Sequence, residues 1–167
     1  MSCQQAVSHS LLFHAHHCYF IEMMTSVLYT RINNLCFFLQ LLLGFAVFSD
    51  RVNMALAGFI IAVVAAYQFE AQPVLIANNA RQRALRYGKV IRRLDDSSYV
   101  DIQENIKQPD PKDNNVLLAI RKAGYIQSSI ATGNPDTAKL KFKLLSLPER
   151  FIIFLAGGIQ YSFIFQG

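Results

Sequence analysis

The chain has 167 residues, a length that fits one domain and excludes a large enzyme with two lobes. Hydrophobic residues make up 53% of the chain and charged residues only 16%, whereas soluble domains carry about 25% charged residues. The first 70 residues hold two basic and three acidic side chains, and the remainder hold 14 basic and 8 acidic ones. This division is typical of a membrane-embedded part joined to a part that faces anionic surfaces. No nucleic-acid-binding motif is present, and no nucleic-acid partner is expected.

Residues 1–31 predict an N-terminal amphipathic helix at the membrane interface. The stretch has no Lys or Arg before Arg31 and therefore lacks the basic region of a secretory signal. We accordingly expect the apolar segments that follow to remain in the mature protein.

The group "HAHHC" in this helix is the densest collection of metal-binding side-chain types. On a helix, His14, His17 and Cys18 fall at i, i+3 and i+4, on one face, a set that suits zinc. However, no fourth ligand is evident, and the three cysteines form no CxxC pair. A second alternative is a pH-sensitive helix, because histidine titrates near neutrality. We favour a plain amphipathic helix with no metal and no cofactor.

Two charge-free runs follow, and they predict a two-span transmembrane hairpin over residues 32–70. Residues 32–49, "INNLCFFLQLLLGFAVFS", and 52–69, "VNMALAGFIIAVVAAYQF", have 18 residues each, near the short end of the 17–25 that a spanning helix needs. The alternative is a pair of buried helices in a soluble bundle. Each run is apolar nearly all round, and a domain of this size could scarcely surround both with protein.

Small residues recur at helical spacing within these spans. Gly58, Ala62 and Ala66 lie along one face of the second span, and Gly44 is a candidate for the facing gap on the first. Small side chains at this spacing let helices approach closely in lipid. They predict a helix-packing face, which would serve within the hairpin or between chains of a homo-oligomer.

The flanking charges predict the orientation of the hairpin. Arg31 precedes the first span and six cations follow the second, whereas the loop at 50–53 offers only Arg51, offset by Asp50. By the positive-inside rule, both ends are cytoplasmic and the loop lies outside. The expected location is the inner membrane of a bacterium, as a multi-pass protein.

Residues 71–150 predict a cytoplasmic helical region. After Pro73, the segment "VLIANNARQRALRYGKVIRRLDD" predicts a long basic helix with a broken apolar stripe. Its cations either dock on anionic lipid headgroups, or they are solvated while the apolar stripe packs on the protein's own tail. A breaker, "PDPKDNN", precedes a second helix over residues 114–133, which "TGNPD" ends. The six expected headgroup contacts are Arg81, Arg83, Arg86, Lys89, Arg92 and Arg93.

Residues 151–167 form an apolar tail. Residues 151–166 carry no charge but include the Gly157–Gly158 pair, and 16 residues are slightly few for a span. We expect an interfacial or re-entrant segment, with a third crossing as the alternative.

The order of these elements resembles the SLATT family, the two-transmembrane effector domains associated with SMODS and SLOG domains in bacteria and their phages. The resemblance covers about residues 9–150: the helix "HSLLFHAHHCYFIEMMTSVLYTRIN", the hairpin with its minimal turn, the helix "NNARQRALRYGKVIRRLDD" and the tail helix "NNVLLAIRKAGYIQSSIATG". It implies a membrane effector of conflict systems that oligomerises and forms pores when a partner senses infection. Within these 167 residues there is no fused nucleotide synthase, sensor or reverse transcriptase, which leaves the trigger open.

Three functions remain at this point. The first is an oligomerising pore-forming or membrane-perturbing effector. Its expected partners are anionic lipid headgroups, other copies of the chain and a soluble sensor protein that activates it. The second is a holin-like lysis protein of a phage, and the third is a membrane scaffold whose tail recruits a soluble partner. Without a phosphate-binding loop, GxSxG or HExxH motif, we expect no enzymatic activity and no catalytic residue.

Overall fold

The computed structural model describes residues 3–47, 53–96 and 117–158, with side chains described for residues 11–47, 53–92 and 117–158. Every regular element within these ranges is an α-helix, which confirms the predicted all-α class. The helices are α1 (Cys3–Val47), α2 (Met54–Ala71), α3 (Pro73–Asp96), α5 (Leu118–Ala131), α6 (Pro135–Lys143) and α7 (Leu147–Leu155).

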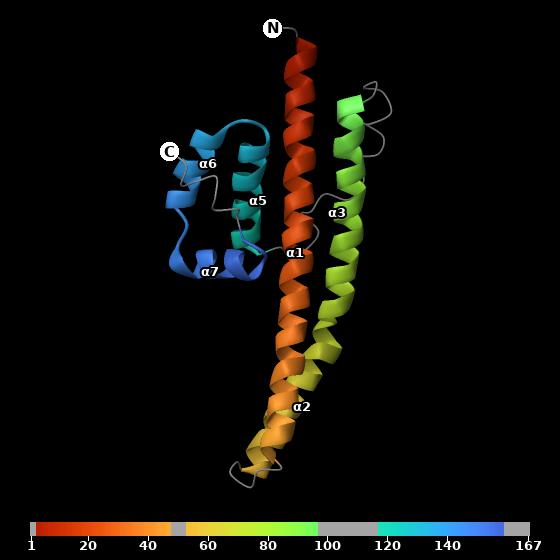
Figure 1. The fold of residues 1–167 in the computed structure, drawn as a ribbon, viewed down its shortest axis with the longest axis vertical. Coiled ribbons are helices and arrows are strands. Elements are labelled where there is room, and N and C mark those ends of the chain that lie inside the picture. Colours follow the sequence, from red (N-terminus) through yellow and green to blue (C-terminus); the bar gives the residue numbers. More distant parts are fainter. Residues whose placement is uncertain (1–2, 48–52, 97–116, 159–167) are drawn as a thin grey trace.

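Helix α1 is continuous over 45 residues and forms the axis of the molecule (Figure 1). We expected a separate interfacial helix to end near residue 31, and the structure differs because nothing in the chain stops the helix there. The first glycine inside α1 is Gly44, and the first proline of the chain is Pro73. At 1.5 Å per residue α1 is roughly 67 Å long.

Helices α2 and α3 return alongside α1 as a second column (Figure 1). The Asn53 side chain caps the start of α2 by accepting from the backbone N–H groups of Ala55 and Leu56, at 3.0 and 3.4 Å. Gln72 ends α2 in the left-handed region, with φ of 42°, and Pro73 begins α3. Because proline cannot continue the hydrogen-bond ladder, the column breaks at this point.

Helices α5, α6 and α7 form a lobe on the side of α1 opposite α3 (Figure 1). Gly133, with φ of 83°, turns the chain after α5, and Pro135 occupies the first turn of α6. A capping box of Ser146 and Glu149 starts α7, which lies across the direction of α1 and on the hairpin side of α5 and α6 (Figure 1).

The buried core lies between the N-terminal part of α1 and this lobe. Its apolar residues include Ile21, Met24 and Leu28 of α1, Ile120 and Ile126 of α5, and Ile153 of α7. The predicted second helix at 114–133 corresponds to α5, whose buried residues include Ile120, Ala123 and Ile126.

The apolar tail does not continue as one helix. Helix α7 ends at Leu155, and Gly157 and Gly158 follow with φ of 102° and 71°, a conformation in which only glycine is unstrained. A single spanning helix through residues 151–166 is therefore interrupted. Residues 159–167, and the predicted breaker at 109–115, lie outside the described residues.

Candidate functional site

The lower end of the molecule is a hairpin of two apolar helices packed on one another. Ala57 of α2 is 1% exposed, and the Gln68 side-chain N–H donates to the Asn33 side-chain oxygen at 3.4 Å. Gln40, the one strongly polar side chain well inside the first run, is only partly exposed. The polar side chains Asn33 and Gln68 therefore fix the pairing of α1 and α2 at the end nearest the lobe.

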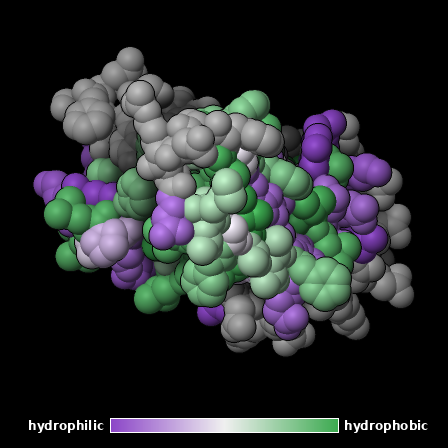
Figure 2. Space-filling view, turned by 90° about the horizontal axis from the view of Figure 1, so that it is seen from below, coloured by the Kyte–Doolittle hydropathy of each residue, from purple (hydrophilic) through white to green (hydrophobic). Residues whose placement is uncertain are grey.

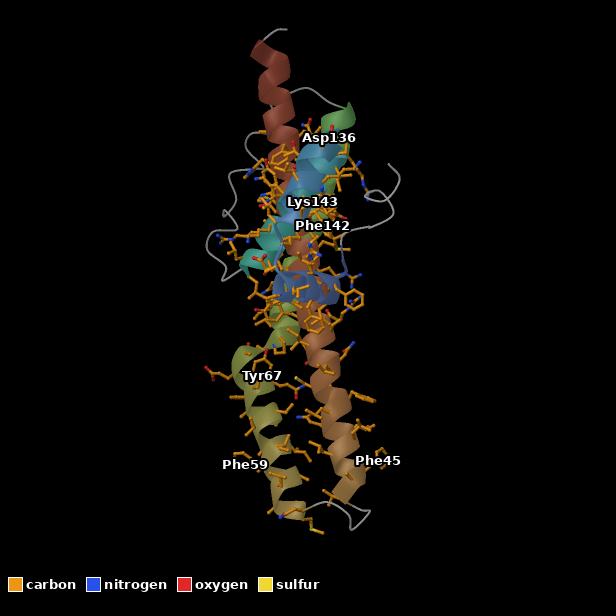
Figure 3. The ribbon with its side chains drawn as sticks, turned by 90° about the vertical axis from the view of Figure 1, so that its left-hand side faces the viewer. Phe45, Phe59, Tyr67, Asp136, Phe142 and Lys143 are labelled. Atoms are coloured by element: carbon orange, nitrogen blue, oxygen red, sulfur yellow. The ribbon has the colours of Figure 1, made fainter. Side chains whose placement is uncertain are left out.

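The remaining surface of this hairpin is apolar and exposed. Phe45 and Phe59 point outward on opposite sides (Figure 3), and each is 67% exposed. In the most apolar 18-residue window of each long helix, none of the first and 6% of the second is buried against protein. The exposed apolar side chains are Leu35, Phe37, Phe38, Leu39, Leu41, Leu42, Phe45, Met54, Leu56, Phe59, Val63, Tyr67 and Phe69.

Two helices are thus long and apolar enough to cross a membrane, Leu11–Val47 and the column Met54–Arg92. The core helix of a soluble protein would be buried on most sides, and the most apolar window of each of these two is not. Seen from the hairpin end, the centre of the molecule is predominantly apolar (Figure 2).

The predicted small-residue face on α2 points outward. Gly58, Ala62 and Ala66 are exposed, and a Cβ added at Gly58 would meet no atom within 4 Å. Gly44 on α1 has the same open surroundings, so it is not a point of close approach between α1 and α2. Within the hairpin, α2 packs through Ala57 instead. The face is free for contacts outside the chain.

A second small-residue stripe, which the sequence interpretation missed, joins α3 to α1. Ala77, Ala80 and Ala84 are at most 4% exposed, and a Cβ on Gly88 would lie 3.5 Å from the Tyr19 ring. Their spacing of three to four residues was the available signal. The cations interleaved with the stripe dominate the composition of this segment, so composition does not single the stripe out.

A buried ion pair lies in this same interface. Arg83 Nε donates to Glu22 Oε1 at 2.9 Å, with the Glu22 side chain 3% exposed and that of Arg83 31% exposed. Burial raises the pKa of Glu22, and the Arg83 guanidinium opposes that rise. Burial also raises the pKa of Tyr87 to about 12, with the Cys18 thiol adding to the effect. Arg83, an expected headgroup contact, is therefore engaged inside the protein.

The other cations of the basic helix follow α3 away from the hairpin. Arg81, Arg86, Lys89 and Arg92 are exposed, and the side chain of Arg93 lies outside the described residues. Because α3 stands beside α1, Arg92 lies roughly 28 Å beyond Pro73 along the helix. The headgroup contacts of the exposed cations stay a prediction, and these cations lie at different levels along α3.

The side chains of "HAHHC" contact different helices. Cys18 is buried toward α3, with its sulfur 3.7 Å from His14 Nε2, while the His17 ring meets Tyr125 of α5 edge-on at 6.3 Å between centroids. Burial lowers the pKa of His17. Among the described residues, no group of three His, Cys, Asp or Glu side chains is placed to hold a metal ion.

Charged side chains fix helix α7 at both ends. Arg31 Nη1 donates to the carbonyl oxygens of Phe154 and Leu155, at 3.0 and 3.2 Å, and so caps the C-terminal end. Lys122 donates to Glu149 at 2.6 Å near the N-terminal end. Lys122 and the backbone N–H of Ser146 hold the pKa of Glu149 below its usual value. Arg31, expected only to orient the first span, thus also joins the hairpin to the lobe.

Comparison with protein families, with curated proteins and with solved structures finds no match for this chain.

Proposed function

We propose that the chain is an integral membrane protein whose hairpin, residues 32–70, is inserted in a bilayer. The observation that carries this proposal is the exposure of apolar side chains around both helices of the hairpin, from Leu35 to Phe69. In water such a surface would be far larger than the apolar patches of soluble monomers. In lipid it needs no protein cover, and the backbone groups are satisfied within each helix.

The charges support one orientation in a bacterial inner membrane. Arg31 and the cations of α3 belong to the helical part above the hairpin, whereas the loop contributes only the self-compensating Asp50 and Arg51. By the positive-inside rule this distribution supports a cytoplasmic location for the N-terminal part of α1, for α3 and for the lobe, with the loop outside. Arg81, the cation of α3 nearest the hairpin, is the best placed of the six for anionic headgroups.

We propose further that chains associate in the membrane and permeabilise it. Gly58, Ala62 and Ala66 form an exposed face, and no described atom lies within 4 Å of a Cβ added at Gly58, which allows a helix of another chain to approach. Gln40 supplies a polar group inside the first span. The resemblance to SLATT effectors supports the same function, in which a soluble sensor partner triggers a homo-oligomeric pore.

Controlled expression with a membrane-potential dye tests this function. We expect the wild-type chain to depolarise cells in proportion to its expression level, and Gly58→Leu with Ala62→Leu to reduce both depolarisation and crosslinked oligomers. Val63→Leu, which adds bulk at another exposed position of α2, is the matched control and should behave as wild type. No depolarisation at any expression level would refute the pore, and unchanged crosslinking would refute the small-residue face.

A membrane scaffold is the second candidate. It is favoured by the size of the part outside the hairpin, in which α3 lies on one side of the N-terminal part of α1 and the lobe of α5, α6 and α7 lies on the other (Figure 1). A scaffold would leave the membrane potential unchanged while the protein remained membrane-bound.

A further inference from the structure

Helix α7 carries an apolar face that no described part of the protein covers. Leu147, Phe151 and Phe154 are 80%, 63% and 62% exposed. Their spacing of four and three residues places them in one stripe along the helix. On the opposite side, Ile153 is 1% exposed and belongs to the core with α1 and α5. The helix therefore has two apolar faces, one buried in the core and one exposed.

The position of α7 determines where this open face points. The helix lies across the direction of α1, between the α5–α6 pair and the hairpin (Figure 1). Because its buried side packs against α5 and α1, the opposite side turns away from α5 and toward the hairpin end. In the view from that end, apolar atoms lie on the side of the lobe as well as at the centre (Figure 2).

The contacts at its ends hold α7 at the level where the apolar part of α1 begins. Arg31, which caps α7 through Phe154 and Leu155, is the last charged residue before the charge-free run of α1. The Lys122–Glu149 pair fixes the other end to α5. An occupant of the open face must therefore lie in the layer beside the first residues of the hairpin's exposed apolar surface.

We propose that this occupant is the phospholipid leaflet itself, so that α7 lies flat in the boundary between headgroups and acyl chains. An interfacial helix buries its apolar face about 5–10 Å deep, which suits Leu147, Phe151 and Phe154. Residues 32–47 extend roughly 24 Å, less than the about 30 Å of a hydrocarbon core, so α7 also marks the depth at which the short hairpin stops. The inference rests on the proposed insertion of the hairpin.

The absence of tryptophan from the chain allows a direct test with single-tryptophan variants of the full protein in liposomes. Phe151→Trp reports α7, Phe59→Trp reports the hairpin, and Leu140→Trp, at a 67% exposed site on α6, is the control outside the membrane. Vesicles contain anionic lipid and acyl chains brominated either near the headgroup or near the chain end. Bromine quenches indole fluorescence at short range.

We expect Phe59→Trp to be quenched most by deep bromine, Phe151→Trp most by shallow bromine, and Leu140→Trp by neither. If Phe59→Trp is quenched and Phe151→Trp matches Leu140→Trp, the inference about α7 is overturned while the inserted hairpin stands. A blue-shifted Phe151→Trp without quenching assigns the face to a second chain and also overturns it. An unquenched Phe59→Trp overturns the proposed function. Phe154→Trp gives an independent reading of α7 if Phe151→Trp misfolds.

Discussion

Mutation of Glu22 and mutation of Arg83 should change the stability of the fold by different amounts, although the two side chains form one ion pair. Removing Arg83 leaves a carboxylate that is 3% exposed without its cation, whereas removing the Glu22 charge leaves a guanidinium that is 31% exposed and can be hydrated. The raised pKa of Glu22 shows that burial outweighs the attraction of Arg83. We therefore expect the pair to add little net stability and to act mainly on how α3 packs on α1.

Arg83→Met should lower the free energy of unfolding by about 2–3 kcal/mol at pH 7, and Glu22→Gln by less than about 1 kcal/mol. Because the folded pKa of Glu22 lies above 4.5, its ionisation penalises the folded state as pH rises from about 4.5 through that pKa. The deficit of Arg83→Met should therefore shrink toward pH 4, whereas that of Glu22→Gln should grow, because only a chain that keeps Glu22 gains stability when this carboxylate is protonated. Thermal unfolding of the protein in detergent at both pH values measures this. Equal losses in the two variants would contradict the asymmetry.

Helix α3 is attached to α1 by small side chains, which let the two backbones approach closely along their length. Ala84 is 2% exposed at this contact, so a larger side chain must push the helices apart. Ala84→Leu should cost about 1–3 kcal/mol of stability, because the buried stripe has no room for three more carbon atoms. Circular dichroism during heating measures the loss. The control Gln82→Leu, at an exposed position of the same helix, should leave the melting temperature within about 2 °C of wild type. An equal loss of stability in Gln82→Leu and Ala84→Leu would show that the stripe is not tightly packed.

The elements themselves were largely predictable from local patterns, and their contacts were not. Charge-free runs indicated the two apolar helices, Pro73 the start of α3 and the 132–136 turn the end of α5, whereas the short helix α6 was not predicted. The continuity of α1 through Arg31 was missed because a change from polar to apolar composition was interpreted as a boundary although no helix-breaking residue is present. The partners of Arg83 and Arg31 depend on which helices meet, and residue spacing within one helix carries no such information.

The whole molecule has two parts, one in which apolar side chains are buried against protein and one in which they are exposed, and this division does not follow the order of the helices in the sequence. Helix α1 passes through both parts: near Ile21 it is packed between α3 and the lobe, and near Phe45 it is exposed except toward α2. Arg31 lies between them and holds α7.

The central claim is that the hairpin crosses the membrane with its loop on the outer side. Labelling of single cysteines with a membrane-impermeant maleimide tests it, in a chain whose Cys3, Cys18 and Cys36 are replaced by alanine. In intact spheroplasts we predict that Ser49→Cys, next to the loop, reacts at once, and that Lys89→Cys on α3 reacts only after lysis. Protection of both cysteines until lysis would contradict the crossing, and reaction of Lys89→Cys alone would contradict the orientation.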